Sequence, residues 1–445
     1  MVALKLLKSG RSLLILLLAF ALLQTRPALA TNGYFRHGYG IQHRAMAGAG
    51  AALSLTPLSV ATNPAALVGM GKRLDISFGL FNPNREYTVS GNPSGFPGTF
   101  PLAPGTVESD SRVFALPSIG LSLEWAGYAI GFAIYGNGGM NTNYPTKTFN
   151  NPQIDFNPPT GVDLAQAFFA VTVAREFAPG HSLGVTGIFA FQRFKAEGLF
   201  AFSPFSLEPN HLTNNGHTNS TGFGARFGYL GKFGDVLSIG AAFQTKIYMS
   251  EFDDYAGLFA EHGDFDIPAN WVAGIALKLN DYITLAGDVQ EVFYSDIASV
   301  GNPMNPAFGN CFGTVQSTGN ADSDQNCLGG DQGPGFAWND MTTVKIGLQI
   351  KASESLTVRA GASHGEQPIP TSDVLFNILA PGVIEDHITA GFSQKLSPKL
   401  TLNVAAMHAF SHSVVGDNPL EAPGQQQIKL KMNQYEGEVG LSINL

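Results

Sequence analysis

The sequence has few charged residues and lacks the patterns of several protein classes. Charged residues make up 13% of its 445 residues, about half the ~25% of an average soluble protein. Disorder would need low hydrophobicity and a high net charge, whereas 44% of the residues are hydrophobic. A coiled coil would need Ala, Glu, Lys and Leu in heptads. The net charge of −9 lacks the basic footprint of a nucleic-acid binder. These three classes are therefore excluded.

Long apolar runs are confined to the N-terminus. Three basic residues precede the apolar run Leu13–Leu23, and Ala28–Ala30 then offers a small-x-small cleavage site. This is the three-part pattern of a secretory signal peptide, whereas a membrane anchor would need about 20 apolar residues. We therefore expect residues 1–30 to be a signal peptide. Because no later run reaches that length, the mature chain could enter a membrane only as strands.

Alternation of apolar and polar residues recurs along the rest of the chain. Residues 283–290, 343–350, 356–363 and 438–445 all show it. A period of two is typical of strands in a sheet whose two faces differ. A water-soluble β-sandwich alternates in the same way, so alternation by itself leaves that class open.

The connections between alternating segments are of two lengths. Short turns lie at residues 126–127, 178–181, 234–236, 280–281, 351–355 and 397–399. Long polar or Gly/Pro-rich segments lie at about 82–111, 137–164, 196–220, 250–268, 294–341, 364–386 and 411–433. Short turns at one end and long loops at the other are typical of outer-membrane barrels. We therefore predict an all-β fold, a 14-stranded antiparallel transmembrane β-barrel over residues 73–445.

Residues 31–72 do not follow the barrel pattern. They are rich in alanine and glycine and show no clean alternation, so short helices and turns are expected. A segment on the periplasmic side of a barrel can fold into the lumen as a plug. Low charge and many small apolar residues favour packing over a flexible tail. We therefore expect residues 31–72 to form an N-terminal hatch in the lumen.

Three motifs resemble the FadL/TodX-type outer-membrane transporter family. Gly48–Ala52 precedes Asn63-Pro64-Ala65, which is similar to the hatch motif of that family. Tyr135–Asn141 and Ile378–Pro381 are the other two. The resemblance implies a 14-stranded barrel in the outer membrane of a Gram-negative cell. It also implies a monomer that contacts outer-membrane lipid and lipopolysaccharide.

The resemblance implies passive uptake of a hydrophobic compound. External loops would capture the ligand, the hatch would rearrange, and the ligand would leave sideways through the barrel wall. The hatch motif would hold the closed form, and Gly136, Gly138 and Gly139 would kink the wall strand that opens. A long-chain fatty acid is the first expected substrate and an aromatic hydrocarbon of the toluene type is the alternative. A general porin and a structural barrel are further alternatives.

Apolar residues gather in two of the predicted external loops. They are Leu199, Phe200, Phe202, Phe205, Leu207, Tyr255, Leu258 and Phe259. Apolar patches on exposed loops usually bind a partner, so these residues are candidates for ligand capture. The alternative is that the loops pack against each other over the barrel mouth.

The sequence contains two cysteines and lacks the common catalytic motifs. Cys311 and Cys327 are close in sequence, and in an exported protein a local disulfide is expected. A metal site is not expected, because no nearby histidine completes a ligand set. The chain has no nucleophile elbow, His-Glu-x-x-His motif or phosphate loop. We therefore expect no enzyme activity, no metal and no cofactor.

Overall fold

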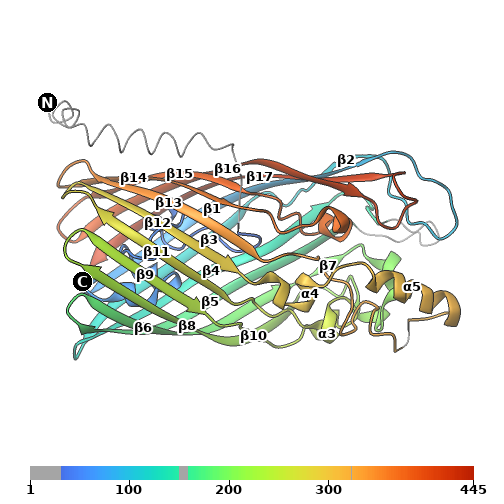
Figure 1. Ribbon diagram of the computed structural model, residues 1–445, viewed down its shortest axis with the longest axis horizontal. Helices are drawn as coiled ribbons and strands as arrows, with labels where there is room; N and C mark the ends of the chain where they lie inside the picture. The colour runs from blue at the N-terminus through green and yellow to red at the C-terminus, as the bar shows by residue number, and fades with distance from the viewer. Residues whose placement is uncertain (1–31, 150–158, 322) are drawn as a thin grey trace.

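A closed antiparallel β-barrel dominates the computed structural model (Figure 1). The structure describes residues 32–149, 159–321 and 323–445, so the expected signal peptide lies outside the described residues. The fourteen wall strands of this part are β1 (Arg73–Ser90), β3 (Phe114–Trp125), β4 (Tyr128–Tyr144), β5 (Thr160–Ala178), β6 (His181–Phe194), β8 (Thr218–Phe233), β9 (Leu237–Gln244), β11 (Asn270–Lys278), β12 (Ile283–Val292), β13 (Met341–Lys351), β14 (Leu356–Gly365), β15 (Asp386–Lys395), β16 (Leu400–Asp417) and β17 (Gln427–Asn444). Strand β1 pairs with both β3 and β17, which closes the sheet. The predicted fold class is confirmed.

The long connections all gather at one end of the barrel (Figure 1). There the short strands β2 (Gly105–Glu108), β7 (Ala196–Glu197) and β10 (Tyr248–Met249) extend the sheet. The loops also carry the α-helices α3 (Ala260–Gly263), α4 (Ala298–Gly301) and α5 (Ala307–Thr318), and the 3-10 helices η4 (Phe200–Phe205), η5 (Pro209–His211), η6 (Asp253–Tyr255), η7 (Tyr294–Asp296), η8 (Thr371–Asp373) and η9 (Phe376–Ile378). The short turns and the C-terminus lie at the opposite end.

The wall strands carry apolar side chains on the outside and polar ones inside. In β1, Ile76, Phe78 and Leu80 are exposed, whereas Asp75 and Ser77 are buried in the lumen. A soluble sandwich would show the reverse arrangement, because its apolar faces meet inside. The outer surface is therefore the one that a hydrocarbon layer requires. No described helix is long and apolar enough to cross a membrane.

Several strands are longer at the loop end than the sequence predicted. Strands β1, β4 and β5 extend into the segments expected to be loops 82–111 and 137–164, and β16 and β17 extend into 411–433. Outward-facing residues there are polar; for example, Asn84 donates to Asn433 across the β1–β17 pair at 3.0 Å. The backbone ladder continues beyond the point where the apolar alternation ends, and for that reason the hydropathy pattern placed these loop boundaries too early.

Residues 32–72 fold inside the barrel, toward the end with the short turns (Figure 1, blue). They contain α2 (Ile41–Arg44), η2 (Pro57–Ala61) and η3 (Pro64–Leu67). Thr56 caps η2 by accepting from the Leu58 N–H, and Asn63 caps η3 in the same way. Each cap is followed by a proline at the first helical position, where no N–H is needed. The Thr-Pro and Asn-Pro pairs therefore set where these two helices begin. We call residues 32–72 the hatch.

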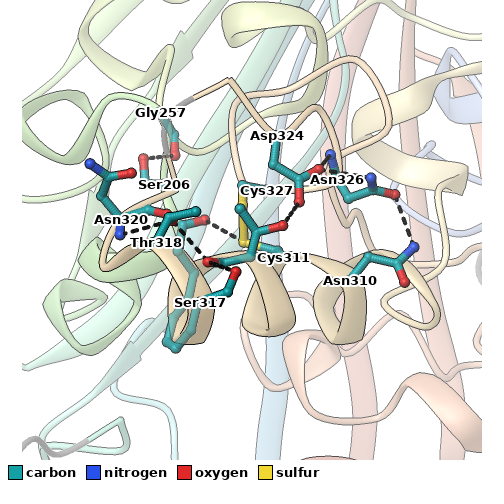
Figure 2. Close-up of a disulfide and its surroundings, with 12 residues drawn as sticks. Ser206, Gly257, Asn310, Cys311, Ser317, Thr318, Asn320, Asp324, Asn326 and Cys327 are labelled. Atoms are coloured by element: carbon teal, nitrogen blue, oxygen red, sulfur yellow. Dashed lines mark hydrogen bonds between the residues drawn. A yellow bond between two sulfur atoms is a disulfide. The ribbon is translucent and has the colours of Figure 1, made fainter.

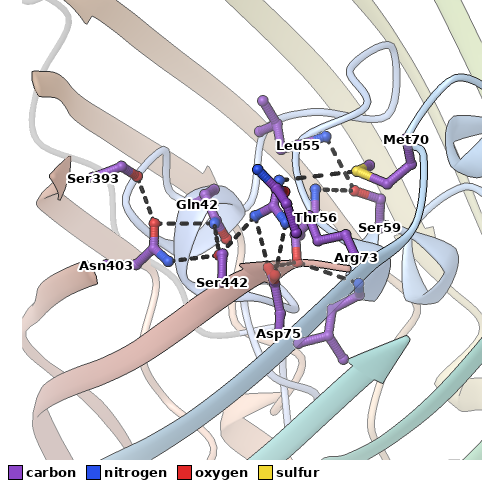
Figure 3. A network of polar contacts seen from close by, with 12 residues as sticks. Gln42, Leu55, Thr56, Ser59, Met70, Arg73, Asp75, Ser393, Asn403 and Ser442 are labelled. Carbon is purple, nitrogen blue, oxygen red and sulfur yellow. Dashed lines mark hydrogen bonds and ion pairs between the residues drawn. The ribbon is translucent and has the colours of Figure 1, made fainter. Parts of the chain in front are cut away.

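Polar contacts hold the hatch against the wall. Figure 3 shows Thr56 donating to Asp75, which also pairs with Arg73, and Gln42 donating to Asn403 at 3.1 Å. Nearby, Arg36 pairs with Glu436 at 3.0 Å. A polar lumen requires such partners, because a buried charge without one is costly.

Arg44 is the central cation of this interface. It pairs with Glu438 at 2.7 Å, also contacts Glu436, and is buried together with both carboxylates.

The substitution Arg44→Gln should loosen the hatch and leave the barrel folded, because the strand ladder does not involve this side chain. Removing one partner of a buried ion pair costs about 3–5 kcal/mol, so amide hydrogen exchange of residues 41–44 should accelerate strongly in detergent-solubilised protein. Arg175→Gln is the control, since that guanidinium lies on an exposed Tyr128 ring. Equal exchange in both variants would contradict the assignment.

Candidate functional site: a cavity behind a gap in the wall

The wall has a gap between β3 and β4. Their ladder ends at the Ser118–Tyr135 pair, although β4 continues to Tyr144. Beyond that pair, β4 continues its strand ladder with β5, with a register shift between Gly136 and Gly138, but has no ladder with β3. The wall closes again where the Asp110 N–H donates to the Asn143 carbonyl at 2.8 Å. A glycine-rich bulge in β4 therefore coincides with an interruption of the barrel.

The first residues of the hatch lie along the free edge of β4. The Arg36 N–H donates to the Asn137 carbonyl at 3.0 Å, and the Gly139 N–H donates to the Tyr34 carbonyl at 3.2 Å. A Cβ atom on Gly138 would lie 1.9 Å from that Tyr34 oxygen. Only glycine permits this approach, so the β4 bulge and the hatch are built to meet. A Cβ on Gly139 would lie 2.4 Å from the Leu164 carbonyl oxygen, whereas Gly136 has room.

Asn137, inside the bulge, fixes this contact from the lumen side. Its side chain accepts from the Tyr39 hydroxyl at 2.7 Å and donates to Gln166 at 3.0 Å. Sequence reasoning selected the neighbouring glycines and missed Asn137 and Tyr39. The available signal was a lone asparagine between glycines in a strand, but its partner in the hatch is 98 positions away.

A cavity of about 520 Å³ lies behind the gap, within the usual size range of ligand pockets. Its apolar lining includes Phe35, Phe81, Phe114, Leu116, Ile134, Leu164, Trp338, Met407 and Met432. Three buried nitrogens on residues of the same lining, Arg36 Nε, Arg85 Nε and His37 Nε2, have no hydrogen-bond partner among the described residues. The cavity can therefore hold an apolar molecule that also carries a hydrogen-bond acceptor.

The hatch motif lies against another part of the wall. The Asn63 amide nitrogen donates to the carbonyls of Ala51 and Tyr229, both at 2.8 Å, and its oxygen accepts from the Ala65 N–H at 3.0 Å. A Cβ on Gly228 of β8 would lie 2.1 Å from that Asn63 oxygen. Asn63, Pro64 and Ala65 are fully buried and do not line the 520 Å³ cavity.

The candidate capture residues form the interior of the loop assembly. Leu199, Phe202, Tyr255 and Phe259 are buried, Phe205, Leu207 and Leu258 are half-buried, and Phe200 is 43% exposed. Four of them, Leu199, Phe202, Leu258 and Phe259, line a second, apolar cavity of about 40 Å³. This is the arrangement in which loops pack over the barrel mouth, so capture from these positions requires the loops to part.

Cys311 of α5 and Cys327 form a disulfide in this loop assembly (Figure 2). The segment that follows is bonded to the loop before β8. The Leu207 N–H donates to the Leu328 carbonyl, and the Leu328 N–H donates to the Phe205 carbonyl, each at 2.9 Å. The disulfide therefore lies where two loops join. Within the described residues, no group of histidine, cysteine and acidic side chains could hold a metal ion.

One loop carboxyl has an unusual electrostatic environment. Burial raises the pKa of Asp264 from 3.8 to about 7, and the nearby Asp266 carboxylate adds to the effect. Lys246, which pairs with Asp266 at 2.9 Å, opposes it. Because the folded pKa is raised, the stability of this loop falls as pH rises from about 4 through 7. At neutral pH this loop therefore carries less negative charge than it would if all its acidic residues were fully ionised.

Comparison with known proteins places this geometry in a family. The model of a family described as outer membrane protein transport protein (OMPP1/FadL/TodX) matches residues 37–442. None of the curated proteins matches the chain in sequence. The Pseudomonas putida toluene transporter TodX is 16% identical with a TM-score of 0.66, covering 93% of this chain and 100% of that one.

Two further solved structures are similar. The Ralstonia pickettii toluene transporter TbuX is 16% identical with a TM-score of 0.60, and a Pseudomonas aeruginosa FadL homologue is 15% identical with a TM-score of 0.64; each pairing covers 92% of this chain and 98% of the other. These likenesses show the fold. The family match spans most of the sequence and confirms the resemblance seen in the motifs. The chain therefore belongs to the OMPP1/FadL/TodX family: it is a transport protein of the outer membrane and not an enzyme.

Proposed function

We propose that this protein takes up long-chain fatty acids passively, by loop capture, binding in the 520 Å³ cavity and lateral exit through the β3–β4 gap. The cavity carries this proposal, because it combines apolar walls with buried cationic nitrogens directly behind an opening in the wall. Each buried methylene contributes about 0.8 kcal/mol, so an acyl chain gains affinity with its length. A carboxylate would satisfy Arg36 Nε and Arg85 Nε by charge-assisted hydrogen bonds.

Lateral exit is supported by the surroundings of the gap. Ile119 of β3 and Phe132 and Ile134 of β4 are exposed on the outer wall beside it. A ligand that leaves there stays in an apolar environment, whereas the lumen below is occupied by the hatch and its ion pairs. This argues against a general porin. Apart from the gap, the described wall strands are paired with a neighbour on both sides, and the hatch covers the β4 edge there, so little strand edge is left for a second copy, which supports a monomer.

The hatch provides the step that links binding to exit. Residues 34–36 occupy the edge of β4 and also line the cavity. A ligand that displaces them gains contact with the gap. Asn63, Pro64 and Ala65 hold the other part of the hatch on β8, so the hatch can change at one end and stay anchored at the other.

Uptake of an aromatic hydrocarbon is the second candidate. Six aromatic side chains, Tyr34, Phe35, Phe81, Phe114, Tyr135 and Trp338, line the cavity, and TodX and TbuX are described as toluene transporters. A hydrocarbon would leave the three buried nitrogens without partners, which favours the fatty acid.

Substrate class is tested by mass spectrometry of co-purified lipid and by competition between oleate and toluene. We expect bound fatty acid that oleate displaces. Arg85→Met should weaken oleate binding on the order of tenfold or more, since a hydrogen bond to a charged group contributes about 1.5–3 kcal/mol, and should not change toluene binding. The control is Arg359→Met, a luminal guanidinium bonded to Gln349 and Ser393 outside the cavity. Binding of toluene alone would favour the second candidate, and binding of neither would favour a porin or a structural barrel.

The hatch contact with β4 is tested by a pair of glycine substitutions. Gly138→Ala places a methyl group against the Tyr34 carbonyl and should displace the hatch edge, whereas Gly136→Ala finds no atom closer than 3.8 Å. We expect faster hydrogen exchange at the Arg36 amide, and faster ligand release, in Gly138→Ala only. The same behaviour in both variants would show that general strand strain is responsible.

The hatch motif is tested with Asn63→Ala. The change leaves the Ala51 and Tyr229 carbonyls without their donor, a loss of about 1–3 kcal/mol for each unsatisfied buried group. Fatty-acid uptake into cells should fall while heat-modifiable migration of the barrel on gels stays normal. Asn84→Ala, which removes an amide from the outer rim, is the control. Unchanged uptake in Asn63→Ala would refute the proposed role.

A further inference from the structure

The loop cavity and the wall cavity adjoin at one turn, Ile378–Pro381. Leu379 lines the 40 Å³ loop cavity, whereas Ala380 and Pro381 line the 520 Å³ wall cavity. Two other segments also contact both cavities. Val162 of β5 and Phe336 in the loop before β13 line the loop cavity, whereas Leu164 and Trp338, two residues further along each segment, line the wall cavity. Three segments therefore mark one boundary between the two cavities.

The turn is held at this boundary by hydrogen bonds to its backbone. The Tyr144 hydroxyl donates to the Ile378 carbonyl at 2.9 Å, and the Thr142 hydroxyl donates to the Leu379 carbonyl at 2.8 Å. Both donors come from the end of β4, the strand that borders the gap, and both are buried. On the other side, Trp338 Nε1 donates to Asn377 at 2.6 Å.

The hydrogen bonds that hold the turn Ile378–Pro381 are of a kind that permits movement. Hydroxyl-to-carbonyl bonds between neutral groups are modest in net strength, and they hold main-chain atoms, so the turn can shift as a unit. Most side chains around it are apolar on both cavity faces, and Asp163, which lies between Val162 and Leu164 and lines the wall cavity, pairs with Arg193 at 3.2 Å. A hydrocarbon chain passing between Leu379 and Val162 would therefore meet mainly apolar groups.

We infer that the turn Ile378–Pro381 is a partition that selects ligands by cross-section, with Leu379 as the specificity-determining residue and Tyr144 and Thr142 as its positioning residues. The inference rests on the proposed function, because it assumes that ligands travel from the loops to the wall cavity. A linear acyl chain needs only a small displacement of the turn to pass, whereas a bulky group needs a larger displacement.

The test compares two fluorescent fatty acids, a linear conjugated polyene and one with a terminal pyrene, in stopped-flow binding to detergent-solubilised protein. Leu379→Ala should raise the association rate of the pyrene acid on the order of tenfold relative to the polyene, equivalent to ~1.4 kcal/mol. Leu379→Trp should slow both. Leu375→Ala is the matched control, because Leu375 is equally buried in the same segment and lines neither cavity.

The outcomes separate the partition from the proposed function. Absence of polyene binding to the unmodified protein would overturn both. Polyene binding with an unchanged rate ratio in Leu379→Ala and unchanged rates in Leu379→Trp would overturn the partition and leave fatty-acid binding in place. The same change of the rate ratio in Leu375→Ala as in Leu379→Ala would do so too.

The positioning residues are tested by removing single hydroxyl groups. Tyr144→Phe and Thr142→Val should raise association and dissociation rates together, by about twofold to tenfold each, at an unchanged equilibrium affinity. A purely structural role would alter stability without that joint shift in rates. Tyr87→Phe is the control, since its hydroxyl bonds to Thr148 and its ring contacts Tyr144 without reaching the turn. No change in either rate, or a change in one rate alone that alters the affinity, would contradict the positioning role.

Discussion

The structure depends on one constraint: in a hydrocarbon layer every backbone N–H and C=O needs a partner within the protein. Closure of the barrel through the β1–β17 and β1–β3 ladders meets it almost everywhere. The exception is the edge of β4 beyond Tyr135, where β3 no longer pairs. Residues 34–36 of the hatch supply the missing partners there. The gap in the wall is therefore covered by a segment of the hatch that satisfies the exposed edge, and the hatch forms part of the wall as well as a plug.

The polar lumen explains how such a segment stays in place. Arg36 and Arg44 meet Glu436 and Glu438 of β17, and Asp288 of β12 accepts from two hatch amides. These contacts are directional, unlike apolar packing, so they define one position for the hatch. Around Asn63 the hatch is held instead by a side-chain amide whose hydrogen-bond partners are main-chain atoms. The hatch is therefore attached to the wall by ion pairs in one part and by amide-to-carbonyl hydrogen bonds in another.

Much of the fold could be predicted from the sequence, because its signals are local. Alternation and the two classes of connection gave fourteen strands, and the short turns lie where the sequence placed them. Asn63-Pro64-Ala65 and the glycines near 138 pointed to the family. An opening at Gly136, Gly138 and Gly139 was expected only from the family resemblance. The residues alone could not predict the extent of the gap, since it depends on the register between β3 and β4 and on a hatch contact about one hundred positions away. The apolar residues of the loops could be recognised in the sequence, but the packing of these loops against each other depends on tertiary contacts. The outer ends of several strands were not recognised in the sequence, because their outward-facing residues, such as Asn84, are polar.

Strand β4 connects these features, because its successive segments serve different parts of the path. Its first half pairs with β3 and closes the wall; Gly136–Gly139 forms the bulge that receives the hatch; and Thr142 and Tyr144 hold the turn between the two cavities. The hatch and the turn thus share one strand, and a shift of that strand acts on both. Displacing Tyr34 frees the β4 edge on the lumen side, and the same edge carries the hydroxyl groups that fix Ile378 and Leu379. In the proposed path, passage into the cavity and release through the gap would therefore be linked through a strand that pairs with β5 on one side and with β3 over its first half only on the other.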